Sequence, residues 1–167
     1  MFKRLLNTRS LCISAVIAAL YAALTLLLAP ISYGPLQCRV SEALTLLPVL
    51  LPEAIPGLTV GCLISNLIGS ATPWDIVFGT LATLIAAVLT YLLRGKTVTK
   101  WQLPLLSALM PVLSNGIIVG LVLALTLNLP LVATMIEVAV GEAVACALGV
   151  LLVCALKGVD FDRLAHQ

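Results

Sequence analysis

Side chains able to bind a small polar molecule are concentrated in residues 33–42. Tyr33, Gln37, Arg39 and Glu42 place an aromatic ring, an amide, a guanidinium and a carboxylate in this short segment. A ring can stack on a flat ligand, the amide and guanidinium donate hydrogen bonds, and the carboxylate accepts them. The segment therefore predicts a ligand-binding surface. The three-residue spacing of Arg39 and Glu42 also fits a purely structural ion pair, which remains an open alternative.

Two more carboxylates lie within the apolar stretch 131–156, which contains no lysine or arginine. A charged residue at the centre of a membrane helix costs about 2.5–3.5 kcal/mol, so Glu137 and Glu142 are candidate functional groups. Five residues separate them, or about 140° around a helix, so we do not expect both to face one small ligand. We expect Glu137, the shallower residue, to contact the ligand. Glu142 is either a second contact or a structural hydrogen-bond hub.

Four other polar residues are candidates for the same site, and each has a structural alternative. Trp74 and Asp75 could form a stacking wall with an acceptor, or they could be an interfacial tryptophan and a residue that stabilises a helix N-terminus. Asn66 and Asn115 could bind ligand or join neighbouring helices by hydrogen bonds.

Signals of catalysis are missing from the sequence. The single histidine, His166, is next to the last residue, and the five cysteines are scattered through apolar runs without metal-ligand spacing. No nucleophile and base stand in a recognised motif. We therefore expect no enzymatic activity, metal or cofactor, although the carboxylates and asparagines could alternatively form an intramembrane enzyme site. The net charge of +2 is dispersed, which argues against nucleic-acid binding.

The composition indicates an all-α integral membrane protein. Hydrophobic residues make up 62% of the chain, charged residues only 10%, and the mean hydropathy is +1.20. We expect one transmembrane domain over residues 1–167, built from six helices that cross the cell membrane. Proline, glycine and charged residues separate the six apolar runs, at about 10–29, 38–51, 56–71, 74–93, 103–127 and 131–156.

The cations predict how these helices are oriented. With six crossings, one side of the membrane receives Lys3, Arg4, Arg9, Arg94, Lys96, Lys100, Lys157 and Arg163. The positive-inside rule makes that side cytoplasmic and places both termini there. Arg39 is the remaining cation and falls on the outer side, where it needs a specific explanation.

Small residues form two neighbouring rows on the first predicted helix. Ala15, Ala19 and Ala23 are one row, and Ala18 and Ala22 belong to the other. Small residues at four-residue spacing let helices approach closely. Because two rows are more than packing within one bundle should require, we expect this face to dock another membrane protein.

Three blocks of sequence resemble a known family. They are YGPLQCRVSEALTLLP at residues 33–48, GCLISNL at 61–67 and DIVFGTLATL at 75–84. They are similar to the QueT-type substrate-binding S components of energy-coupling factor (ECF) transporters. The resemblance implies a six-helix bundle that binds a queuosine precursor, a 7-deazaguanine compound, near the outer face. It also implies a transmembrane coupling subunit, docked on the alanine rows, and two cytoplasmic ATPase subunits. An S component for another small nutrient, and a bundle that serves only assembly, are the alternatives.

Overall fold

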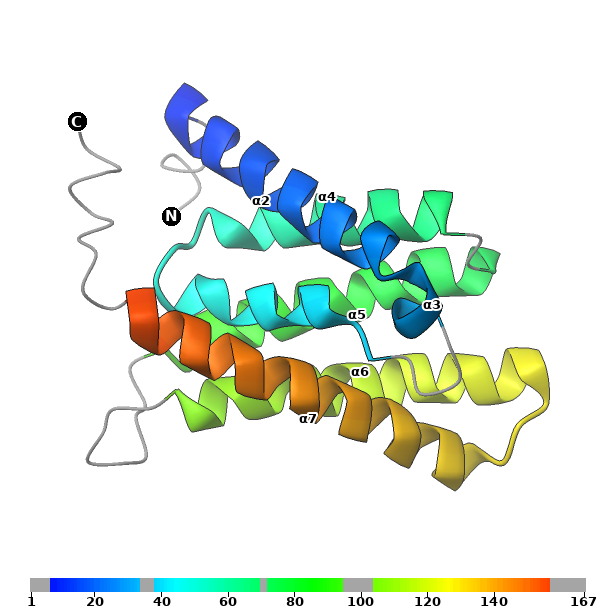
Figure 1. Ribbon diagram of the computed structural model, residues 1–167. Coiled ribbons are helices and arrows are strands. Elements are labelled where there is room, and N and C mark those ends of the chain that lie inside the picture. The colour runs from blue at the N-terminus through cyan, green and yellow to red at the C-terminus, as the bar shows by residue number, and fades with distance from the viewer. Residues whose placement is uncertain (1–6, 34–37, 70–71, 95–103, 157–167) are drawn as a thin grey trace.

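The computed structural model describes residues 7–33, 38–69, 72–94 and 104–156, and all regular structure in these ranges is helical (Figure 1). The helices are α2 (Thr8–Leu27), α3 (Ala29–Ser32), η1 (Val40–Val49), α4 (Ala54–Ile68), α5 (Pro73–Leu92), α6 (Leu105–Leu127) and α7 (Leu131–Leu156). The prediction of an all-α protein is confirmed. Four of these helices, α2, α5, α6 and α7, are long and apolar enough to cross a membrane.

The second and third predicted spans are shorter than the other four. Helix α4 has 15 residues, which reach about 22 Å at 1.5 Å per residue. The 3₁₀ helix η1 has 10 residues, which reach about 20 Å at 2.0 Å per residue. Both lengths fall below the roughly 30 Å of a bilayer's hydrocarbon core. The structure therefore supports four spans by length.

Helix η1 is the centre of the bundle, and it contacts α2, α4, α5, α6 and α7 (Figure 1). Residues 41–48 are all buried. Three residues per turn divide its side chains into three rows. Leu44 and Leu47 pack in a core cluster with Tyr21 of α2, whereas Leu46 packs in a second cluster with Cys146 of α7. The third row includes Glu42, which accepts hydrogen bonds from Tyr21 of α2 and Thr83 of α5. This division lets one short helix join the other elements.

Helices α2 and α4 pack backbone to backbone. A Cβ atom added to Gly57 would lie 2.6 Å from the carbonyl oxygen of Ser14, and one added to Gly61 would lie 2.8 Å from that of Ala18. Ala18 and Ala22 are buried. This row was predicted to be surplus to the bundle, and that prediction is wrong, because the close approach of α4 needs the small residues at these positions.

The other alanine row on α2 faces away from the protein. Ala15, Ala19 and Ala23 are all exposed. They lie among exposed Leu11, Val16 and Leu20. The structure therefore leaves one of the two predicted docking rows available to a partner.

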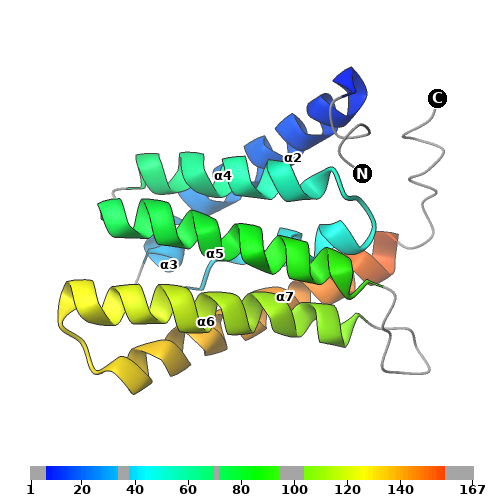
Figure 2. The same ribbon diagram turned by 180° about the vertical axis from the view of Figure 1, so that it is seen from behind.

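The described ends of the chain lie at the same end of the bundle (Figure 1). Helix α2 begins there and α7 finishes there, and Figure 2 shows that α5 also ends there and α6 begins there. At this end, Thr90 and Ser107 join α5 to α6, since each hydroxyl donates to the other residue's carbonyl oxygen, at 3.2 and 3.4 Å. The ligand-binding candidates gather farther along the bundle.

Candidate functional site

A small cavity lies between η1 and helices α5, α6 and α7. Its volume is about 10 Å³, roughly the space that one water molecule needs. The walls combine a polar surface with valine side chains, and they comprise Arg39, Glu42, Gly79, Thr83, Asn115, Val119, Val138 and Glu142. A ring compound could enter only if these walls moved apart. The structure therefore presents a closed polar site.

Glu42 is fixed in the cavity wall by two uncharged donors. The hydroxyl of Tyr21 on α2 donates a hydrogen bond to Glu42 Oε1, and the hydroxyl of Thr83 on α5 donates to the same oxygen at 3.3 Å. Glu42 is 1% exposed, and its other oxygen, Oε2, has no hydrogen-bond partner. The carboxylate is thus held through one oxygen while the other remains able to accept a hydrogen bond.

Glu142 is held in a similar way from the opposite wall. Asn115 Nδ2 on α6 donates to Glu142 Oε1 at 2.9 Å. Glu142 is 3% exposed, and its Oε2 is buried without a hydrogen-bond partner. Burial of an unpaired carboxylate oxygen is costly, so a ligand that donates to it would be favoured.

Arg39 comes immediately before η1 and lies within the same cavity wall. Its guanidinium carbon lies 5.2 Å from the centre of the Tyr33 ring, a cation–π distance. Burial raises the pKa of the Tyr33 hydroxyl, which donates to the carbonyl oxygen of Ser65 at 2.7 Å. Arg39 Nε is buried without a hydrogen-bond partner. Tyr21 and Thr83 hold Glu42 by hydrogen bonds, and the guanidinium of Arg39 lies in the same cavity wall.

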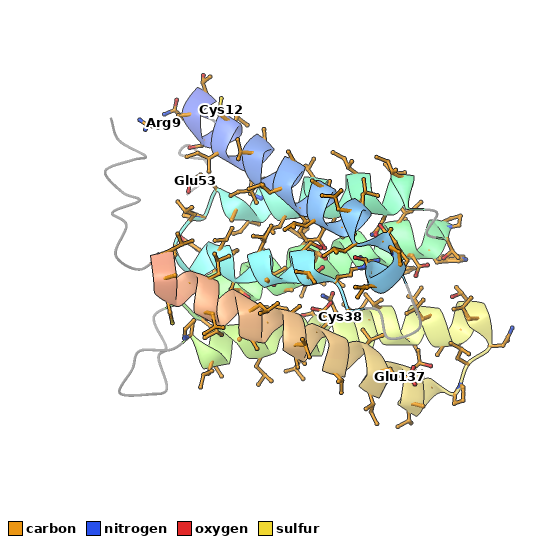
Figure 3. The ribbon with its side chains drawn as sticks, viewed as in Figure 1. Arg9, Cys12, Cys38, Glu53 and Glu137 are labelled. Carbon is orange, nitrogen blue, oxygen red and sulfur yellow. The ribbon has the colours of Figure 1, made fainter. Side chains whose placement is uncertain are left out.

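Cys38 connects the start of η1 to α7 (Figure 3). Its thiol donates a weak hydrogen bond to the carbonyl oxygen of Gly141, with sulfur and oxygen 3.6 Å apart. Gln37, a predicted contact, lies outside the described residues.

The two carboxylates of α7 occupy opposite environments. Glu137 is exposed near the start of the helix, away from the cavity, and Figure 3 shows it at the surface. Glu142 lines the cavity. The predicted separation of the two residues around the helix fits these positions, and Glu137, which we expected to contact the ligand, does not line this cavity. Val138, not Glu137, is the residue of this turn that reaches the cavity.

Trp74 and Asp75 lie at the start of α5 and are not part of the cavity wall. Trp74 is 60% exposed and stacks on Phe78, with ring centres 6.0 Å apart. It lines an open apolar groove of about 860 Å³ between α5 and α6. Asp75 forms a capping box with Thr72: its backbone N–H donates to the Thr72 hydroxyl, and its carboxylate accepts from the Thr72 backbone N–H. Asp75 therefore fits the structural alternative of stabilising a helix N-terminus.

Asn66 joins two helices beside the site. Its amide donates to Cys62 Sγ at 3.5 Å and to the carbonyl oxygen of Asp75 at 3.4 Å, which links α4 to α5. It does not line the cavity. Of the two asparagines, Asn115 is the one that lies in the cavity wall.

Several residues of the site were not anticipated from the sequence: Tyr21, which holds Glu42, and Gly79, Thr83, Val119 and Val138 in the cavity wall. Tyr21 is the only aromatic residue of α2 and precedes Thr25 by one turn, and Thr25 donates to Ser41 Oγ at 2.7 Å. Polar residues one turn apart in an apolar helix indicate a face that meets other polar groups. Gly79 and Thr83 have the same spacing on α5.

These features define a multi-pass helical membrane protein whose buried polar site is assembled from several helices, an arrangement suited to binding and transport. Buried ionisable groups within such a bundle mark ligand or ion sites. The chain belongs to the QueT transporter family, whose model matches residues 11–158. This is a transporter family, not an enzyme family.

One curated relative is similar over part of its length. It is the queuosine precursor transporter QueT of Lactococcus lactis subsp. cremoris (strain MG1363), which is 44% identical over 81 residues. The matched region spans 47% of this chain and 47% of the relative. No solved structure is significantly similar to the chain.

Proposed function

We propose that the protein is the substrate-binding S component of an ECF-type importer and that it captures a queuosine precursor, a 7-deazaguanine compound. The main support is the set of buried polar atoms without partners in one cavity: Arg39 Nε, Glu42 Oε2 and Glu142 Oε2. Membership in the QueT family and the name of the Lactococcus relative point to the same class of substrate.

The chemistry of a 7-deazaguanine fits these atoms. Its N–H and amino edge offers donors to the carboxylate of Glu42, and its carbonyl group accepts from a guanidinium such as Arg39. Tyr33, which already lies against Arg39, offers a ring for stacking. Because the cavity holds only about 10 Å³, binding in this proposal includes outward movement of the walls.

In the proposed arrangement, six helices traverse the bundle and both termini are cytoplasmic. The start of α2 and the end of α5 lie at one end of the bundle (Figures 1 and 2). Arg9 belongs to the first turn of α2, and Arg94 comes just after the end of α5. This supports a cytoplasmic assignment for that end by the positive-inside rule. The exposed row of Ala15, Ala19 and Ala23 would dock the transmembrane coupling subunit. Two cytoplasmic ATPase subunits would drive import.

Ligand binding to the purified protein tests this function. Calorimetry in detergent should detect binding of a 7-deazaguanine precursor to the wild type and weaker binding to Glu42→Gln. Loss of one hydrogen bond to a buried charge, about 1.5–3 kcal/mol, predicts a loss of about tenfold to hundredfold in affinity. Glu137→Gln is the matched control, because this carboxylate is exposed on the surface. Absence of binding to the wild type, or equal affinity in Glu42→Gln, would contradict the proposal.

A further inference from the structure

The charges in the cavity wall do not balance. Two carboxylates, Glu42 and Glu142, face it together with one guanidinium, that of Arg39. All three residues are at least nine-tenths buried. Among the described residues, no other charged group lines the cavity. When both carboxylates are ionised, one negative charge is in excess, and an unbalanced buried charge is strongly unfavourable.

The two carboxylates share one cation, because Arg39 is the only guanidinium or ammonium group among the described residues that line the cavity. Glu42 follows Arg39 by three residues, and both side chains lie in the cavity wall. Glu142 comes from a different helix, and the donor that holds it is the uncharged amide of Asn115. Its second oxygen has no hydrogen-bond partner.

We propose that Glu142 is a specificity-determining residue that selects precursors carrying a positively charged amino group. This inference rests on the proposed function, and it assigns different parts of the ligand to different walls of the cavity. The uncharged deazaguanine ring is recognised by η1, through Arg39 and Glu42. A primary ammonium group on the ring then reaches Glu142 Oε2, completes its hydrogen bonding and neutralises the excess charge.

Asn115 is a positioning residue for this contact. By donating to Oε1, it orients the carboxylate so that Oε2 stays free for the ligand. A neutral amide at this position holds the carboxylate without neutralising it, whereas a lysine or arginine would remove the need for a cationic ligand.

Two ligands that share a ring and differ in charge test the inference. Calorimetry at pH 7 compares 7-aminomethyl-7-deazaguanine, which carries an ammonium group, with the uncharged 7-cyano-7-deazaguanine. The wild type is expected to bind the ammonium compound at least tenfold more tightly. Glu142→Gln keeps the shape of the side chain and removes its charge. This variant is therefore expected to reduce the ratio of the two affinities, ammonium compound over cyano compound, to about threefold or less. The ratio isolates charge selection, because a purely structural loss would weaken both ligands alike.

Glu137→Gln, on the same helix but exposed, is the control and should leave the ratio unchanged. If Glu142→Gln does not fold, Asn115→Ala is the second variant, and its ratio should fall at least threefold as the carboxylate loses its anchor. The inference is overturned if the wild type binds both ligands with equal affinity, or if the affinity ratio is unchanged in a folded Glu142→Gln or Asn115→Ala variant. In either case the proposed function stands. Binding of neither ligand by the wild type refutes the proposed function itself.

Discussion

The substitution Gly149→Ala tests how η1 is held against α7. A Cβ atom at Gly149 would lie 2.5 Å from the carbonyl oxygen of Ala43 and 3.2 Å from its carbonyl and α carbons. All three atoms belong to the backbone, so no change of rotamer relieves the contact. To restore the 3.4 Å of ordinary contact, η1 and α7 must separate by about 0.9 Å.

The expected loss of stability follows from this displacement. Overpacking of a closely packed interior costs about 1–3 kcal/mol. The better helix propensity of alanine offsets up to about 1 kcal/mol of that cost. The shift also reaches the site, because Ala43 adjoins Glu42 and Glu142 lies two turns before Gly149 on α7. We therefore expect lower affinity for the ligand together with a lower melting temperature.

Thermal unfolding in detergent, followed by calorimetric binding, measures both effects. Gly116→Ala is the matched control, since it makes the same exchange inside a long apolar helix. Its Cβ would lie 3.1 Å from the Cβ of Ala139, a milder contact. Gly149→Ala should melt several degrees below Gly116→Ala. The reasoning is refuted if Gly149→Ala melts at or above the wild-type temperature and binds ligand equally well.

Four further substitutions test the site, the helix cap, the α2–α4 contact and the docking surface separately. Tyr21→Phe removes one of the two hydrogen-bond donors to Glu42 and should weaken ligand binding, measured by calorimetry, about tenfold. Unchanged affinity would show that the hydrogen bond from Thr83 alone is enough to hold Glu42 for binding. Thr72→Ala breaks the α5 capping box and should cost about 1 kcal/mol in thermal unfolding while affinity stays constant. Ala18→Leu should destabilise the α2–α4 contact and lower the melting temperature. Ala19→Leu should preserve the melting temperature and reduce co-purification with the proposed coupling subunit. Equal melting temperatures of the two variants would count against this packing.

The sequence alone was sufficient to predict the features that depend on residues close together in the chain. Hydropathy indicates membrane helices because each run is apolar along its whole length, and α2, α5, α6 and α7 follow the predicted runs closely. Arg39 and Glu42 were predicted as neighbours from their three-residue spacing, and both line the same cavity.

Features that depend on the packing of distant segments could not be predicted in the same way. Both α7 carboxylates lie in an equally apolar sequence, and only the position of α6, which carries Asn115, determines that Glu142 is the buried one. A membrane helix that is apolar on every side does not distinguish the face toward lipid from the face toward the bundle. Likewise, the burial of Ala18 depends on glycines of α4, which are distant from it in the chain.

The three-residue turn of η1 has a consequence for how sequences of this kind can diverge. Each residue advances about 120° around a 3₁₀ helix. One residue inserted within η1 would therefore rotate the side chains after the insertion by about 120° relative to those before it, whereas an insertion of three residues would restore their relative direction. Length changes in multiples of three, and not single insertions, are the ones that keep the three rows of this central helix facing their present neighbours.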